Sequence, residues 1–153
     1  MSDSISTPMV KGVEALALAI WRFEGNSFQC RNYRNANPGN LRESPLEAGV
    51  DGQGYAYFPN VTAGYLALLR DLYEKFSGKS GTHLTPRSTI YDLLSVYAPV
   101  TDGNYPVHYS QFVAGFMGAW RGLSKGPQTP LGEIWTPEQG LPWDSQLNSY
   151  LKI

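Results

Sequence analysis

An apolar stripe at helical spacing runs along residues 8–23 and ends, without a break in its period, in a glutamate. Apolar side chains that recur every three or four residues form one face of an α-helix, and such a face packs against a core. Thr7 and Pro8 are of the types that begin a helix, and Gly25 is of the type that ends one. The sequence therefore predicts a helix from about Pro8 to Phe23, with the next residue still on the core-facing side. The stripe consists of Val10, Val13, Ala17, Ile20 and Glu24.

The rest of the chain alternates helical patterns with turn-rich connections. Residues 25–53 are rich in Gly, Asn, Pro and Ser and predict loops with room for a short hairpin, and residues 55–58 predict a short strand. Further helices are predicted at 61–77, at 85–98, where Thr85 is the N-cap and Pro86 the first position, and at 105–123. We therefore expect an α+β fold that is mainly α and has a small β element.

The length of 153 residues predicts one domain, residues 1–153, with one hydrophobic core. Its core is expected to cover about residues 8–123. Residues 124–153 are rich in Pro and Gly, and we expect them to form an aromatic-rich C-terminal tail that wraps the body and is held by Trp135 and Trp143.

The charge balance and the cysteine count exclude several classes of function. The chain carries 12 basic and 13 acidic residues, for a net charge of −1, which argues against nucleic acid or an anionic membrane surface as a partner. No apolar run is long enough to span a bilayer, so no membrane insertion is expected. With Cys30 as the only cysteine and two histidines, we expect no internal disulfide, no metal and no cofactor.

Glu24 is the first candidate for chemistry. A glutamate on the apolar side of a helix is costly to bury as an anion. Desolvation raises its pKa and keeps it protonated nearer neutral pH, which is the state that a general acid needs. The alternative is structural: the carboxylate pairs with a nearby arginine, for which the sequence offers Arg22, Arg31, Arg34 and Arg42.

Four segments in order carry a resemblance to a known family. They are Glu24-Gly25, "NANPGNLR" at 35–42, "FPNVTAGYLALLRDL" at 58–72 and "YAPVTDGNYPVHYSQFV" at 97–113. Together they resemble a lysozyme-like family of phage and bacterial proteins related to goose-type lysozymes and lytic transglycosylases. The resemblance covers roughly residues 10–118 and leaves the chain after Trp120 unmatched.

The resemblance implies a lysozyme-like fold and a site built around Glu24 as the catalytic residue. Ala36 and Asp102 depart from the family pattern, which commonly has Asn and Glu at these two positions. The motif after the first helix would shape the floor of a sugar groove, and tyrosines would stack on sugar faces. The expected substrate-binding residues are Asn37, Asn40, Arg42, Tyr57, Asn104 and Tyr109.

The activity that this resemblance implies is cleavage of peptidoglycan at the β-1,4 bond between N-acetylmuramic acid and N-acetylglucosamine. Glu24 would act as general acid and then as base. A lytic transglycosylase needs no second acid, whereas a muramidase positions water with a second carboxylate. Asp102 is the first candidate for that second carboxylate, followed by Glu43, Glu47 and Asp51. We favour the transglycosylase slightly because no second acid stands out in the sequence.

Two other classes of function stay open. The first is a glycan-binding or structural module on a lysozyme-like fold that does no chemistry, since a fold does not fix a function. The second is an antibacterial effector whose cleft is blocked by an immunity or inhibitor protein. The first residues lack a basic segment followed by an apolar one. We therefore expect a monomer made in the cytoplasm without a signal peptide, which reaches the periplasm or cell wall through phage lysis, a virion or a secretion system.

Overall fold

The computed structural model describes residues 8–25, 30–76, 84–98, 105–122 and 124–134. Its helices are α1 (Pro8–Glu24), α2 (Arg31–Arg34), α3 (Val61–Phe76), α4 (Ile90–Tyr97) and α5 (Pro106–Arg121), and the short 3-10 helix η2 (Leu131–Glu133) follows. A small antiparallel sheet pairs β1 (Gly49–Val50) with β2 (Ala56–Tyr57), with Gly49 opposite Tyr57. The described chain is thus mainly helical with one small β element, as the sequence predicts.

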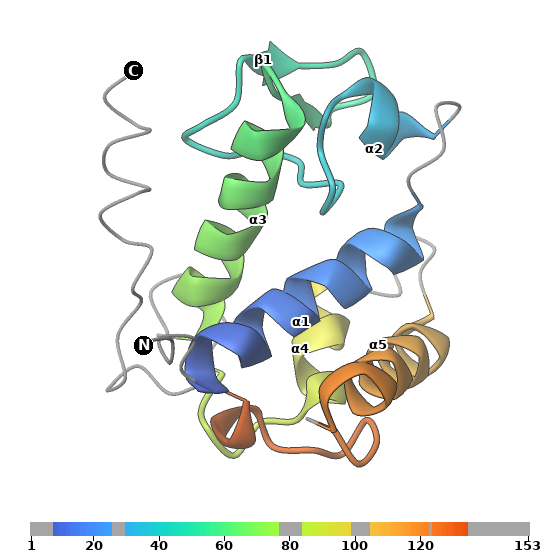
Figure 1. The fold of residues 1–153 in the computed structure, drawn as a ribbon. Helices are drawn as coiled ribbons and strands as arrows, with labels where there is room; N and C mark the ends of the chain where they lie inside the picture. Colours follow the sequence, from blue (N-terminus) through green and yellow to red (C-terminus); the bar gives the residue numbers. More distant parts are fainter. Residues whose placement is uncertain (1–7, 26–29, 77–83, 99–104, 123, 135–153) are drawn as a thin grey trace.

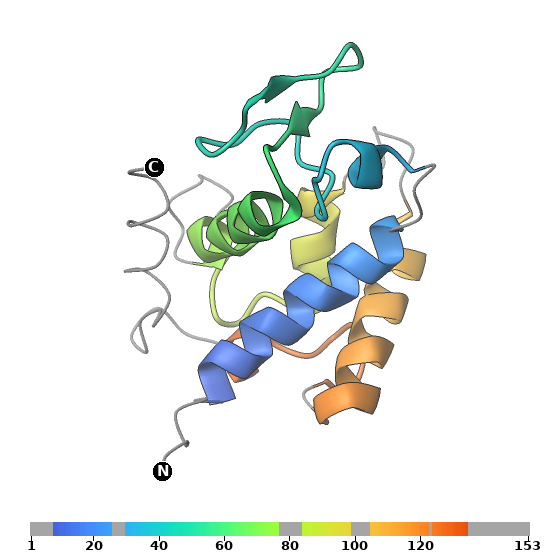
Figure 2. The same ribbon diagram turned by 45° about the horizontal axis from the view of Figure 1, so that its top comes forward.

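Helix α1 lies at the centre of the arrangement (Figure 1). It packs against α5 and α3, and α4 packs against α5. The hairpin and α2 lie together at one end, beyond the C-terminal half of α1 (Figure 2). Both views show the hairpin and α2 at this end, so the hairpin end and the helical body are distinct parts of the fold.

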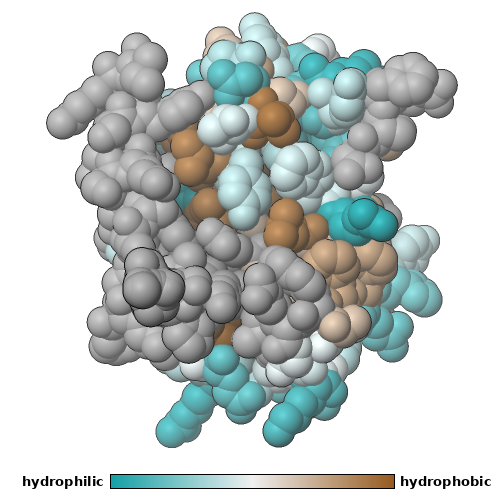
Figure 3. Space-filling view, in the orientation of Figure 1, coloured by the Kyte–Doolittle hydropathy of each residue, from teal (hydrophilic) through white to brown (hydrophobic). Residues whose placement is uncertain are grey.

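The stripe of α1 is buried where its side chains are described. Ala17 and Ile20 are wholly buried, and Glu24 at the end of the same face is half-buried. Ala17 and Ile20 join a main core that α3, α4 and α5 share, while a second cluster under the hairpin contains Leu41, Ala56 and Phe58. On the face seen in Figure 3, hydrophobic side chains are visible over α3 and the adjoining part of α1.

Helix α4 begins four residues later than the sequence predicted. Its N-cap is Thr89, which accepts from the Asp92 backbone N–H at 3.1 Å while the Asp92 carboxylate accepts from the Thr89 N–H at 2.9 Å. This reciprocal capping box fixes the start of the helix. Thr85 instead opens a turn in which the Ser88 N–H reaches its carbonyl at 2.9 Å. The prediction of Thr85 as N-cap was therefore wrong.

Hydrogen bonds from residues 124–134 prevent the turn at 85–88 from being part of helix α4. The Leu131 N–H donates to the Ser88 carbonyl at 2.7 Å, and the Gly132 N–H donates to the Pro86 carbonyl at 2.9 Å. These carbonyls are thus occupied by the later segment, and Leu131 and Ile134 enter the main core. Trp135 and Trp143, which were expected to hold the tail, lie outside the described residues. In the described part of the chain, no helix is long and apolar enough to cross a membrane.

Candidate active site

Glu24 is the last residue of α1, and two features fix its place. Gly25 ends the helix with a φ of 94°, a left-handed conformation that glycine adopts without strain. The Asn32 side chain, on α2, donates a hydrogen bond to the Gly25 carbonyl. The sequence predicted only loops and a short hairpin at 25–53 and missed helix α2. Through Asn32, this helix holds the segment that follows α1 against the end of α1. The glutamate is therefore held at a fixed helix end and not on a free loop.

The carboxylate of Glu24 is held by a tyrosine from a distant helix. The Tyr109 hydroxyl, on α5, donates to Glu24 Oε2 at 2.7 Å. The Tyr109 ring is wholly buried and stacks on Phe23 with centroids 3.8 Å apart, while Tyr97 meets its edge at 6.4 Å. Tyr109 was expected to bind substrate. Its burial and its hydrogen bond instead make it the residue that orients the Glu24 carboxyl group.

The surroundings of Glu24 raise its pKa above the ordinary value of 4.5. Burial is the largest cause, because desolvation disfavours the ionised form. Hydrogen bonds from the Tyr109 and Asn40 side chains and the positive charge of Arg31 act in the opposite direction and only partly offset it. The carboxyl group therefore keeps its proton to a higher pH than an exposed glutamate does.

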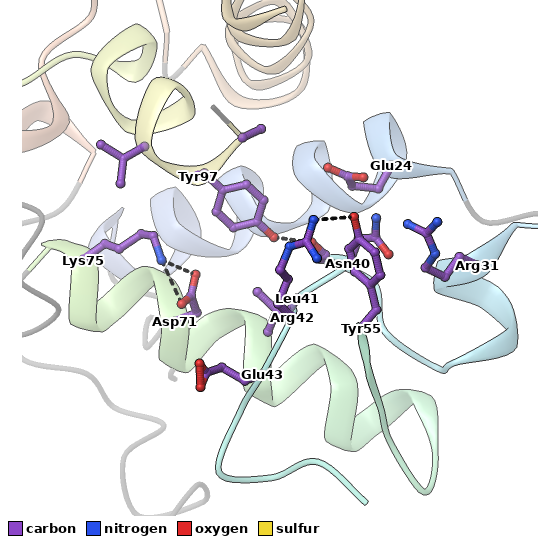
Figure 4. A pocket seen from close by; sticks show the side chains of 13 residues that line it. Glu24, Arg31, Asn40, Leu41, Arg42, Glu43, Tyr55, Asp71, Lys75 and Tyr97 are labelled. Carbon is purple, nitrogen blue, oxygen red and sulfur yellow. Dashed lines mark hydrogen bonds and ion pairs between the residues drawn. The ribbon is translucent and has the colours of Figure 1, made fainter. Parts of the chain in front are cut away.

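A cleft of about 450 Å³ opens beside Glu24. Figure 4 shows Arg31, Asn40, Arg42 and Tyr55 gathered across from the glutamate, with Lys75 and Asp71 farther along on α3. Tyr97 lies between these two groups. The walls combine charged, amide and aromatic side chains, which suits a polar ligand. The lining residues are Glu24, Arg31, Gly39, Asn40, Leu41, Arg42, Glu43, Tyr55, Asp71, Lys75, Val96, Tyr97 and Ala98.

Asn37 does not face this cleft. Its side chain is wholly buried, and its amide nitrogen donates to the carbonyls of Leu41 and Ala56 at 2.9 Å each. Its amide oxygen accepts from the Leu41 N–H, also at 2.9 Å. Each polar atom of the amide is used inside the protein, so the expected contact with a ligand does not fit. Asn37 instead ties the turn at 37–41 to the hairpin.

Asn40 does line the cleft, as expected of a ligand-binding residue. Its backbone has a φ of 53°, in the left-handed region that Asn tolerates better than most residues. Its side chain donates to Glu24, and its amide oxygen is buried with no partner among the described residues. A buried acceptor without a partner is costly, and a ligand donor would satisfy it.

Gly39 serves packing as well as the cleft. The Tyr97 hydroxyl donates to the Gly39 carbonyl at 2.5 Å. A Cβ atom at this position would lie 2.5 Å from the Tyr97 hydroxyl oxygen and 2.8 Å from the Leu68 side chain. The absence of a side chain at Gly39 therefore lets Tyr97 and Leu68 pack closely against this turn.

Ala36 is the position where the family pattern commonly has Asn, and its backbone has a φ of 50°. A left-handed conformation costs alanine about 1 kcal/mol, whereas Asn visits it routinely. We expect Ala36→Asn to raise the free energy of unfolding by roughly 0.5–1 kcal/mol, measured by chemical denaturation. Ala48→Asn is the control, since Ala48 is exposed and outside the positive-φ set. An equal gain at both positions would contradict this explanation.

Arg42, Tyr55 and Arg31 form the wall across from Glu24. Arg42 Nη2 donates to the Tyr55 hydroxyl oxygen at 3.1 Å, and Arg31 lies over the same ring. Tyr57, the expected stacking residue, is exposed on β2 and does not line the cleft. Tyr55 takes that place. The sequence offered Tyr55 and Tyr57 alike as groove tyrosines and Arg31 as a partner for Glu24, but nothing in it selected Tyr55 over Tyr57.

The candidates for a second carboxylate have different surroundings. Asp102 and the predicted ligand residue Asn104 lie outside the described residues. Asp51 accepts from the Asn35 side chain at 2.8 Å and from backbone N–H groups of its own turn, and these bonds lower its pKa to about 2. The Glu47 carboxylate accepts from the Ser44 N–H at 2.8 Å. Both acids therefore support turns.

Glu43 and Asp71 remain, because both line the cleft. Asp71, which the sequence did not suggest, accepts hydrogen bonds from Lys75 at 2.8 Å and is neutralised by it. Glu43 is exposed. Within the described ranges, no group of three or more His, Cys, Asp or Glu side chains is arranged to hold a metal ion.

Comparisons with protein-family models, with curated proteins and with solved structures found no match for this chain.

Proposed function

We propose that the protein cleaves the glycan of peptidoglycan between N-acetylmuramic acid and N-acetylglucosamine, on a lysozyme-like fold. The observation that carries this proposal is the state of Glu24. It combines a fixed helix end, a hydrogen bond from Tyr109 at 2.7 Å and a raised pKa beside a polar cleft. These are the properties of a general acid. The order of the four sequence motifs supports peptidoglycan as the substrate.

In the proposed reaction, protonated Glu24 gives its proton to the glycosidic oxygen as the bond to the muramyl C1 breaks. Positive charge develops on the sugar ring as an oxocarbenium-like centre. Glu24 is then ionised, and the Tyr109 hydroxyl and the Asn40 amide stabilise the carboxylate through the hydrogen bonds that they donate. These two groups lower the pKa of Glu24 against the effect of burial, and they thus stabilise the ionised carboxylate that proton transfer produces.

Two second steps are compatible with this site. In a lytic transglycosylase, ionised Glu24 removes the proton of the muramyl 6-hydroxyl, whose oxygen bonds to C1 and closes a 1,6-anhydro ring. In a muramidase, water adds to C1 and loses a proton to a carboxylate. Among the described acids that line the cleft beside Glu24, Asp71 is paired with Lys75 and Glu43 is exposed, which favours the route that needs Glu24 alone.

The products distinguish these two steps. Purified sacculi would be digested with the wild-type protein, and the soluble fragments reduced with borohydride before mass spectrometry. A reducing muramyl end gains two hydrogen atoms on reduction, whereas a 1,6-anhydro end does not change. We expect unreduced anhydro ends. Reduced muramyl ends would establish hydrolysis, and fragments with neither kind of muramyl end would refute the proposed bond.

Tyr109→Phe is expected to lower the rate and to move its pH profile. The tyrosine hydroxyl lowers the pKa of Glu24 by stabilising the ionised form. Without it the pKa of Glu24 rises further, so the protonated acid survives to higher pH. The alkaline limb of the rate profile should therefore shift upward.

Tyr105→Phe is the matched control for this prediction. Tyr105 precedes the same helix, and its side chain is 71% exposed. Its hydroxyl should affect neither limb of the rate profile. A rate loss in Tyr109→Phe with an unmoved alkaline limb would contradict the role of Tyr109 in setting the protonation of Glu24.

A further inference from the structure

Two arginines in the cleft are not used by the mechanism above. The Cζ atom of Arg31 lies 3.9 Å from the centroid of the Tyr55 ring, and the Cζ atom of Arg42 lies 4.4 Å from it. Arg31 also donates from Nε to the Gln53 side-chain oxygen at 3.0 Å. The ring thus holds two guanidinium groups in one wall of the cleft (Figure 4).

The other charges of the cleft leave this wall positive. Asp71 and Lys75 neutralise each other at 2.8 Å. Asp51 feels the charge of Arg31, but its oxygens accept hydrogen bonds from a side-chain amide and from N–H groups of its own turn. Glu43 is exposed at the cleft. The two arginines therefore face the hydrogen-bonded Asp51, the exposed Glu43, and Glu24, whose pKa burial raises.

The geometry of these arginines suits a carboxylate. A guanidinium group has five N–H donors in a planar fork that can give two parallel hydrogen bonds to one carboxylate. The side-chain contacts given above engage one N–H of Arg31 and one of Arg42. Packing against the Tyr55 ring restrains both groups before a ligand arrives, which lowers the cost of ordering them.

We propose that Arg31, Tyr55 and Arg42 form a carboxylate-recognition site, through which the cleft selects acidic glycan strands over neutral strands of N-acetylglucosamine. This inference rests on the proposed function, because it names the substrate feature that the same cleft reads. Two kinds of carboxylate occur on peptidoglycan: the lactyl group of a muramyl residue without its peptide, and the acidic groups of an attached peptide.

Binding measurements with a variant that lacks the catalytic acid test this site independently of catalysis. We would measure the Kd of the Glu24→Gln variant for three oligosaccharides of equal length: neutral N-acetylglucosamine, peptide-free muramyl strands and peptide-bearing strands. At least one acidic ligand should bind about tenfold or more tightly than the neutral one. The tighter of the two acidic ligands identifies which carboxylate is read.

Arginine substitutions in the same background test the wall itself. Arg42→Gln should weaken binding of the acidic ligand about tenfold and leave the neutral ligand unchanged. Arg42→Lys keeps the charge but loses the fork, so it should bind with an intermediate Kd. Arg42 is exposed, which makes loss of folding unexpected. Arg87→Gln removes the same charge from an exposed position outside the cleft and should change neither Kd.

The outcomes distinguish failure of this site from failure of the proposed function. Equal Kd values for acidic and neutral ligands, no binding of any acidic ligand, or equal weakening of both by Arg42→Gln would overturn the carboxylate site. If the wild-type protein cleaves no strand while arginine-dependent binding of an acidic ligand persists, the enzyme assignment fails and the carboxylate site stands.

Discussion

Glu24→Gln is expected to lower the rate of peptidoglycan cleavage by at least about 100-fold, because general acid catalysis contributes roughly that much or more. The glutamine side chain has nearly the same shape and can still accept the hydrogen bond from Tyr109. It has no proton of suitable pKa to give to the glycosidic oxygen. The rate would be measured by release of soluble label from dye-labelled sacculi at equal concentrations of folded protein.

Glu133→Gln is the matched control for this substitution. Glu133 is an exposed acid on η2 and does not line the cleft. Its replacement removes the same charge and should leave the rate unchanged within about twofold. Loss of rate in both variants would point to a general charge effect, and full activity of Glu24→Gln would exclude Glu24 as the acid.

Glu24→Gln is also expected to change the stability of the protein. The pKa of Glu24 is higher in the folded protein than its ordinary value of 4.5, so ionisation favours the unfolded chain. This destabilisation is absent below the unfolded pKa and grows as pH rises through the folded pKa. The free energy of unfolding of Glu24→Gln, relative to wild type, should therefore increase between about pH 4 and pH 7. Chemical denaturation at the two pH values measures it, and a relative decrease would contradict the raised pKa.

Asn37→Ala is expected to give the largest loss of stability among the site residues. The side chain is wholly buried and makes three hydrogen bonds to the backbone of Leu41 and Ala56. Removing it takes this partner from the Leu41 N–H and the Ala56 carbonyl, at about 1–3 kcal/mol for each group left buried and unsatisfied. The Leu41 carbonyl still accepts from the Ala56 N–H at 3.0 Å. We expect the free energy of unfolding to fall by about 3 kcal/mol or more, measured by denaturant titration.

Asn40→Ala is the comparison for this prediction. Asn40 is half-buried, lines the cleft and leaves its amide oxygen without a partner among the described residues. Asn40→Ala should lower the free energy of unfolding less than Asn37→Ala does. It should also lower the cleavage rate under conditions in which the variant is fully folded. The opposite pattern, a stable Asn37→Ala that has lost only activity, would restore Asn37 to the ligand-binding set.

The helices with long apolar periods were readable from the sequence. The structure has α1, α3 and α5 within about two residues of their predicted ends, because the periodicity and the Pro and Gly boundaries agree there. The start of α4 was mistaken because both Thr85 and Thr89 are good N-caps. The choice between them depends on hydrogen bonds from residues 131 and 132 to the backbone of the intervening turn. Helix α2, with four residues, is too short to produce a period.

The site was readable in part, because Glu24 and the predicted ligand residues Asn40 and Arg42 all line the cleft. Glu24 stood out because it continues an apolar stripe, a local pattern. The Tyr109 hydroxyl that holds it comes from 85 residues away along the chain. The local sequence pattern likewise could not show that the Asn37 side chain makes its hydrogen bonds to the backbone of Leu41 and Ala56. Nor could it show that Tyr55 and not Tyr57 lines the cleft. These facts depend on how the hairpin end meets the helices, which is a property of tertiary packing.

The most direct test of Glu24 as a glycosidase acid is the mass spectrum of muropeptides released from purified sacculi by the wild-type protein, beside that from Glu24→Gln. The proposal predicts soluble fragments that end at muramyl residues in the wild-type digest and their absence from the Glu24→Gln digest, with both proteins folded. Fragments in equal amounts from both proteins, or none from the folded wild type on sacculi of several peptidoglycan types, would contradict it.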